Sequence, residues 1–217
     1  MTETVRRPLS RDLVLETALS LVDHEGLGAL SMRRLGQELG VEAMSLYHHV
    51  ANKDDILDGM VDTVFGEIEL PGEGTEWKTA MRRRARSARA ALTRHPWAIS
   101  IMESRRSPGP ATLRHHDAVI GACRRAGFSV QMAAHAFSLI DSYIYGFVLQ
   151  EVNLPFDDGD DLEEVVASMM LPFSADDYPH LVELTTDYIL KPGYSYANEF
   201  EYGLGLILDS LKAAAHG

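Results

Sequence analysis

The sequence predicts an all-α protein with two modules and about nine to ten helices. Apolar residues recur at the spacing of amphipathic helices along almost the whole chain, and the alternation typical of a half-buried strand is missing. The segment PGEG at 71–74 interrupts this pattern and predicts a break in the helices. We therefore expect one module at residues 1–70, with three short helices and a connecting fourth, and a larger helical module at 71–217.

The first, second and fourth predicted helices each have a start signal. A serine or asparagine precedes the apolar pattern and can accept a hydrogen bond from the first turn of the helix. Glycines follow the first two helices, where a left-handed stop is common. The predicted caps and stops are Ser10, Gly26, Ser31, Gly40 and Asn52, and the third helix is expected at about 42–49.

The second module is expected to hold about six further helical segments. The longest and most apolar of them begins after Ser129. The expected ranges are 76–94, 97–103, 111–125, 129–152, two pieces within 160–190 that divide near Pro172, and 196–215.

Composition and charge exclude several classes of protein. The single cysteine, Cys123, rules out an intramolecular disulfide framework and is expected to be a buried small apolar residue. The net charge of −12 argues against a protein that coats nucleic acid non-specifically. Residues 1–53 nevertheless hold six Lys and Arg against seven Asp and Glu, whereas residues 126–217 hold two against fifteen. Any DNA-binding face must therefore lie near the N-terminus.

The chain is expected to be cytoplasmic, with no membrane partner. Its first residues carry charge but no apolar core, unlike a signal peptide. We see no run that approaches the roughly 18 apolar residues of a membrane span.

The segment SMRRLGQELGVEAMSLYHHV, residues 31–50, has the pattern of a helix-turn-helix. Two steeply crossing helices need a small residue where they touch and a left-handed residue in the turn, and Gly36 and Gly40 supply them. Apolar residues on both helices would lock the crossing angle. A plain three-helix core with no nucleic-acid role is the alternative, but Tyr47 and Lys53 add polar groups suited to phosphates and base edges.

Residues 10–65 resemble the DNA-binding domain of the TetR family. LGVEAMSLYHHVANKDDILDGM, residues 39–60, is similar to that family's signature, in which the tyrosine, the histidine two residues later and the Asn-Lys pair occur together. The resemblance implies that Tyr47 and Lys53 hold phosphates of operator DNA. It also places variable, base-reading positions at residues 42–44, which are mostly apolar here, so we expect thymine-methyl contacts. The full expected DNA-contact set is Arg33, Glu42, Ala43, Met44, Ser45, Tyr47, His48, His49 and Lys53.

Residues 76–212 resemble, more weakly, the C-terminal domain class that includes the tetracycline repressor. The similar segments are RHPWAISIM, the long helix from Ser129 and EFEYGLGLILDSL. The resemblance implies a homodimer through a four-helix bundle, although the same apolar stripes could instead face an intramolecular core. The expected interface residues are Leu139, Tyr143, Phe147, Phe200, Leu204, Ile207, Leu208 and Leu211.

A pocket for a small hydrophobic or amphipathic effector is expected between the helices of the second module. Each of its candidate residues could equally be plain core. His115 and His116 could bind an anion or accept a hydrogen bond, and a solvated surface histidine is the equal alternative. The arginines at 82–84, 86 and 89 are interpreted as a solvated helix face. The pocket candidates are Trp97, Met102, His116, Phe137, Asp141 and Tyr145.

Taken together, these patterns favour a ligand-responsive, DNA-binding transcription regulator, a repressor or else an activator. A helical enzyme is the first rival, but no nucleophile elbow, phosphate loop or metal-binding helix motif is present. Glu103, Asp141 and His116 could form an acid–base set, yet nothing fixes their geometry. An adaptor dimer that has lost DNA binding is the second rival, and the intact Arg33, Tyr47 and Lys53 argue against it. Adjacent His48 and His49 point about 100° apart on a helix, so no metal site is expected. No cofactor is expected, and the acidic run at 157–161 is interpreted as a solvated loop.

Overall fold

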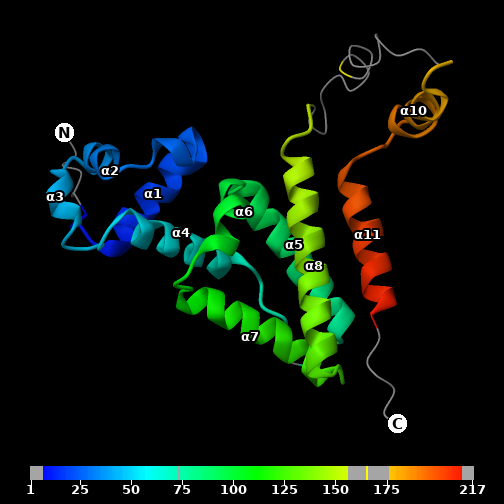
Figure 1. Ribbon diagram of the computed structural model, residues 1–217, viewed down its shortest axis with the longest axis horizontal. Coiled ribbons are helices and arrows are strands. Elements are labelled where there is room, and N and C mark those ends of the chain that lie inside the picture. The colour runs from blue at the N-terminus through cyan, green and yellow to red at the C-terminus, as the bar shows by residue number, and fades with distance from the viewer. Residues whose placement is uncertain (1–6, 73, 156–164, 166–175, 212–217) are drawn as a thin grey trace, which may run out of the picture. The chain divides into compact units, whose positions relative to one another are not determined.

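The computed structural model describes residues 7–72, 74–155, 165 and 176–211, and this part of the chain is all-helical (Figure 1). It contains ten α-helices and no strand, as the sequence predicts. The chain forms two compact units, and the boundary between them falls inside helix α8, after Tyr145. This packing boundary does not coincide with the predicted seam near residue 70, which remains a prediction about sequence modules.

Of the first four helices, α1, α2 and α4 begin where the cap residues predict. They are α1 (Arg11–Glu25), α2 (Met32–Leu39), α3 (Ala43–Leu46) and α4 (Lys53–Glu67). The Ser10 and Ser31 hydroxyls accept from backbone amides at 3.2 Å, and Asn52 does so at 2.9 Å. Helix α3 ends earlier than the expected residue 49. The amides of Tyr47 and His49 bond three residues back rather than four, so the chain tightens into a turn there.

Four helices follow in the first unit, and α8 continues into the second. They are α5 (Trp77–Arg94), α6 (Trp97–Ile101), α7 (Pro110–Arg125) and α8 (Val130–Glu151), with a 3-10 turn at Met102–Ser104 between α6 and α7. Alanines dominate the buried face of α5 and allow neighbouring helices to approach closely. Cys123 is fully buried on α7, as expected, and burial raises the pKa of its thiol.

The second unit combines the end of α8 with α10 (Pro179–Leu184), a π-helical turn at Thr185–Ile189 and α11 (Ala197–Ser210). The Phe147 ring stacks on Tyr196 with centroids 4.9 Å apart and meets Phe200 edge-on at 5.1 Å. The predicted helix division near Pro172 and the acidic run at 157–161 lie outside the described residues.

Helix α8 reaches the length and mean hydropathy of a membrane-crossing helix. Its apolar residues do not form one continuous run, because Asp141, Ser142 and Gly146 interrupt them. Its inner side is nevertheless packed against the rest of the protein and carries Asp141, which pairs with Arg84. A buried ion pair within the fold accounts for this helix as a core element.

Candidate nucleic-acid interface and buried polar cluster

The turn between α2 and α3 has the geometry that the two glycines predict. Gly40 adopts a left-handed conformation with φ of 62°, and the Val41 amide donates to the Gly36 carbonyl at 2.9 Å. A Cβ atom on Gly36 would lie 2.9 Å from the Val41 carbonyl oxygen and 3.2 Å from the Ala43 nitrogen. Only glycine fits here without movement of the backbone, so this contact sets how closely α2 and α3 approach.

The predicted base-reading and phosphate residues lie on the outer side of this motif. Met44 is 73% exposed and Tyr47 is 46% exposed, although both are large side chains that folding would otherwise bury. Leu46, between them in the sequence, is fully buried and anchors α3. The predicted residues that are exposed are Arg33, Glu42, Met44, Tyr47, His48 and Lys53, and those that are half-buried are Ala43, Ser45 and His49.

Two adjacent arginines on α2 have different surroundings. Arg34 donates to Glu25 at 2.7 Å and lies 2.8 Å from Glu38. Arg33 is exposed, and no ion pair is found for it among the described residues. The structure thus leaves Arg33, the predicted DNA contact, available to a phosphate or a base.

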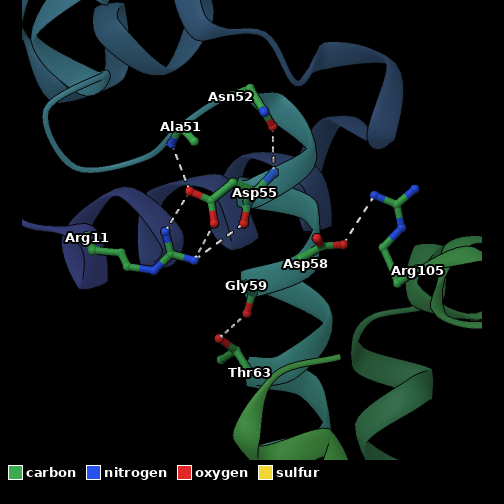
Figure 2. Close-up of polar contacts among 8 residues, drawn as sticks. All are labelled: Arg11, Ala51, Asn52, Asp55, Asp58, Gly59, Thr63 and Arg105. Atoms are coloured by element: carbon green, nitrogen blue, oxygen red, sulfur yellow. Dashed lines mark hydrogen bonds and ion pairs between the residues drawn. The ribbon is translucent and has the colours of Figure 1, made fainter. Parts of the chain in front are cut away.

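A clamp between α1 and α4 positions the start of α4 (Figure 2). Arg11 donates to both carboxylate oxygens of Asp55, at 2.9 and 2.7 Å, and this guanidinium lowers the pKa of Asp55. Asp55 also accepts from the Ala51 amide at 2.8 Å. Because these bonds fix the first turn of α4, they also fix where Lys53 emerges.

Three other carboxylates of α4 connect the helix to the following elements. Asp58 lies 3.5 Å from Arg105, as Figure 2 shows, and Asp54 accepts from the same guanidinium at 3.1 Å. Asp62 accepts from the backbone amide and the hydroxyl of Thr112, at 2.8 and 2.9 Å, and so caps the start of α7. Helix α4 is therefore held by the helix-turn-helix at one end and by α7 at the other.

Trp97, an expected pocket residue, lies at another junction. Its indole nitrogen donates to Asp23 of α1 at 2.6 Å. His95 bridges the same Asp23, at 2.8 Å, and Glu67 of α4, at 3.2 Å. The assignment of Trp97 to the pocket is thus not supported by its polar contact, which ties the start of α6 to α1.

A cluster of polar side chains is buried in the first unit. The Arg84 side chain is 1% exposed and forms an ion pair with Asp141. Its Nε donates to His115 Nε2 at 3.0 Å, and the Tyr145 hydroxyl donates to the second oxygen of Asp141 at 3.3 Å. We call Arg84, His115, Asp141 and Tyr145 the polar cluster. Burial and the neighbouring Asp141 raise the pKa of Tyr145, so its hydroxyl stays protonated.

Aromatic rings surround one side of the polar cluster. Phe65 of α4 lies 5.2 Å from the His115 ring and 5.3 Å from the His116 ring, measured between centroids. His116 meets Phe137 edge-on at 5.2 Å. Four of the six expected pocket residues, His116, Phe137, Asp141 and Tyr145, are thus in or beside the cluster, and Met102 is buried on its 3-10 turn.

One interpretation from the sequence was wrong here, because Arg84 does not belong to a solvated helix face. Of the two readings left open for His115, burial excludes the solvated one, and its Nε2 accepts a hydrogen bond. The signal for Arg84 was its spacing, because it follows Ala80 and precedes Ala88 by four residues each on the inner face of α5. His115 shows the same logic, since it lies three residues after Thr112 and four before Val119, both buried on α7.

The buried His115 makes stability depend on pH. Burial, followed by the charge of Arg84, lowers its pKa from 6.5 to about 3. Between these values the unfolded histidine binds a proton that the folded one rejects, so stability is full above 6.5 and falls as the pH decreases. Relative to His115→Asn, the wild type should lose up to about 1.4 kcal/mol per pH unit below 6.5. Urea unfolding at several pH values measures this, and parallel pH curves for the two proteins would contradict it.

The predicted dimer residues differ in how far they are buried within the single chain. Phe200, Leu204 and Leu208 are fully buried within the single chain, so the intramolecular-core alternative holds for them. Phe147 and Leu211 are also buried, Tyr143 and Ile207 are half-buried, and Leu139 is exposed. On α11 the large exposed apolar side chains are instead Tyr202 and Leu206, which the sequence interpretation did not select.

This arrangement defines a helix-turn-helix protein whose first compact unit also holds a buried polar centre. Comparison with protein families agrees. The family of bacterial regulatory proteins named tetR matches residues 14–60, and the tetracyclin repressor-like C-terminal domain matches residues 70–215. The chain belongs to the TetR family.

Similar proteins are transcription regulators. A repressor, DrrR1 of Streptomyces coeruleorubidus, is 31% identical over 97% of this chain and 82% of its own length. A regulator of Saccharopolyspora erythraea is 37% identical over 66% of this chain, and the match covers 61% of that relative. The TetR family protein ActR of Streptomyces coelicolor, in complex with actinorhodin, superposes with a TM-score of 0.78 at 31% identity, covering 96% of this chain and 98% of ActR. These relatives support a regulator rather than an enzyme.

Proposed function

We propose that the chain is a homodimeric, cytoplasmic transcription regulator that represses from operator DNA and is released by a small-molecule effector. The observation that carries this proposal is the glycine-built turn that presents Met44 and Tyr47 to solvent. A fold that needed these helices only for its core would bury such side chains. An activator of the same family is the second candidate, and the position of the operator relative to the promoter decides between them.

Operator contacts would come mainly from α3 and the first turn of α4. Tyr47 and Lys53 would hold phosphates and set the register, while exposed Met44 would contact thymine methyl groups. One helix of four residues reads few bases, which is why two copies are needed. In a dimer, recognition helices about 34–36 Å apart would read a palindrome.

The effector domain would be residues 71–217 and the DNA-binding domain residues 1–70, with α4 as the link. Asp55 ties α4 to α1, and Asp62 ties it to α7. An effector that moves α7 would therefore move the anchored start of α4 and Lys53. If so, effector and DNA weaken each other's binding by the same factor. Complexes of the relative ActR with actinorhodin and with (S)-DNPA support a small-molecule effector.

A DNA-binding assay across a salt series tests the proposal. The DNA is the fragment upstream of the protein's own gene, and binding is followed by fluorescence anisotropy. Tyr47→Ala combined with Lys53→Ala should weaken binding about a hundredfold. Because each neutralised phosphate contributes about 0.9 to the salt slope, loss of Lys53 from both protomers should reduce that slope by about two.

The matched control replaces the same residue types away from α3. Tyr178→Ala with Lys191→Ala removes a tyrosine and a lysine from exposed positions of the second unit. This control should bind DNA like the wild type. Equal DNA binding by the Tyr47→Ala, Lys53→Ala variant and by the control would exclude the helix-turn-helix as the DNA-reading element.

A further inference from the structure

The polar cluster contains two buried hydrogen-bond donors that find no acceptor among the residues that the structure describes. One is Nη2 of Arg84 and the other is Nδ1 of His115. The other polar atoms of the cluster are engaged. Arg84 uses Nη1 for Asp141 and Nε for His115, and Tyr145 uses its hydroxyl hydrogen for Asp141.

The contact between Arg84 and His115 shows that His115 Nδ1 is a donor. A guanidinium nitrogen can only donate, so His115 Nε2 must accept and the ring hydrogen must be on Nδ1. Arg84 faces this ring on one side and His116 lies beside it, with ring centroids 5.8 Å apart. The neutral tautomer is therefore fixed by geometry, and its Nδ1–H is held in place within the fold.

The two unpartnered atoms of the cluster are both donors. Both oxygens of Asp141 accept hydrogen bonds, and its charge is compensated by Arg84. A ligand group that only accepts hydrogen bonds would satisfy Nη2 and Nδ1, and an ionised oxygen would do so most strongly because the guanidinium is charged. A ligand group that can only donate, such as an ammonium, would satisfy neither of these two donors.

Aromatic rings line one side of the polar cluster. The rings of Phe65, His116 and Phe137 meet at tilted or edge-on angles beside the cluster. Aromatic faces and edges of this kind pack well against another aromatic ring. The polar cluster and these rings together combine oxygen recognition with an aromatic wall.

We propose that Arg84 and His115 bind an ionised oxygen, carboxylate or phenolate, of an aromatic effector. This inference rests on the proposed regulator function and specifies the chemistry of its effector. Arg84 supplies the charge-assisted bond through Nη2, and His115 supplies the second bond through Nδ1. Asp141 and Tyr145 are positioning residues, because they hold the guanidinium in one orientation.

A matched pair of probes tests the proposal on the full-length protein. 2-Naphthoate carries the ring and the carboxylate, and 2-naphthylmethanol carries the same ring without an ionised oxygen. Calorimetric titration of the wild type should show 2-naphthoate binding about tenfold tighter or more, as expected for one charge-assisted hydrogen bond. No binding of 2-naphthoate, or equal affinity for both probes, would overturn the proposal.

Variants assign the preference to the two donors. Arg84→Met and His115→Phe should each abolish the preference for 2-naphthoate, whereas Arg83→Met, the exposed neighbour on the same helix, should retain it. If Arg84→Met alone fails to fold, Arg84→Met with Asp141→Leu removes the buried charge at the same time. Retained preference in the Arg84 and His115 variants would also overturn the assignment.

DNA binding measured on the same samples separates this inference from the function on which it rests. A wild type that binds DNA but not 2-naphthoate would leave the regulator function intact and overturn only the effector chemistry. A wild type that binds no DNA would contradict the function itself. Release of DNA by 2-naphthoate, but not by 2-naphthylmethanol, would support both.

Discussion

Replacing Gly36 by alanine should weaken DNA binding about tenfold or more, although it adds only one methyl group. The new carbon would lie 2.9 Å from the Val41 carbonyl oxygen and 3.3 Å from the Ala43 Cα. These are backbone atoms, so relief requires α3 to move away from α2. The exposed face of α3 then no longer fits the major groove of the operator DNA. We expect a stability loss of about 1–3 kcal/mol, measured by urea unfolding, alongside the anisotropy assay.

Gly66 provides the matched control for this prediction. It lies on α4, where an added Cβ would meet only the Ala111 Cβ at 3.8 Å, an ordinary contact. Gly66→Ala should therefore stabilise the helix by about 0.5–1 kcal/mol and leave DNA binding unchanged. If the same glycine-to-alanine change lowers the free energy of unfolding at residue 36 and raises it at residue 66, the destabilisation arises at the α2–α3 crossing. A Gly36→Ala protein that binds DNA like the wild type would contradict the close-approach explanation.

Removing the carboxylate of the polar cluster should have the largest effect on stability. Asp141→Leu leaves the Arg84 guanidinium buried with no counterion. A buried charge that loses its partner costs about 3–5 kcal/mol. Arg84→Met with Asp141→Leu should recover most of this loss, because two apolar side chains of similar size can replace a buried ion pair. Urea unfolding of the wild type, both single variants and the double variant measures the coupling.

This second prediction is decided by whether the stability losses of Arg84→Met and Asp141→Leu add in the double variant. A double variant that is more stable than Asp141→Leu alone would show that the loss arises from the uncompensated charge. Costs that simply add would mean that the two residues act independently, contrary to the buried ion pair. A small cost for Asp141→Leu would show that water reaches the guanidinium.

The DNA-binding fold could be predicted because its determinants are local. Ser10, Ser31 and Asn52 satisfy amides within one turn of their own position, so the helix starts follow from the sequence. Gly40 is a local requirement in the same sense, because its left-handed conformation disfavours other residues. The close approach at Gly36 involves residues only five to seven positions away.

The buried polar cluster could not be predicted, because its partners come from distant segments. Arg84 and Asp141 are 57 residues apart, and charge alone places both on the surface. Only the helical spacing of Arg84 with alanines indicated an inner face. The apolar stripe of α11 was ambiguous for a related reason. A stripe shows that a face is covered, but not whether the same chain or a partner covers it.

Selection of bound sites from a random double-stranded DNA library tests the central claim most directly. The operator sequence need not be known for this selection, and the wild type and the Tyr47→Ala, Lys53→Ala variant can be run in parallel. We predict that the wild type enriches a two-fold symmetric site whose half-sites are about one helical turn or a multiple of it apart, and that the variant does not. Enrichment of no sequence by the wild type, or of the same site by the variant, would contradict the account.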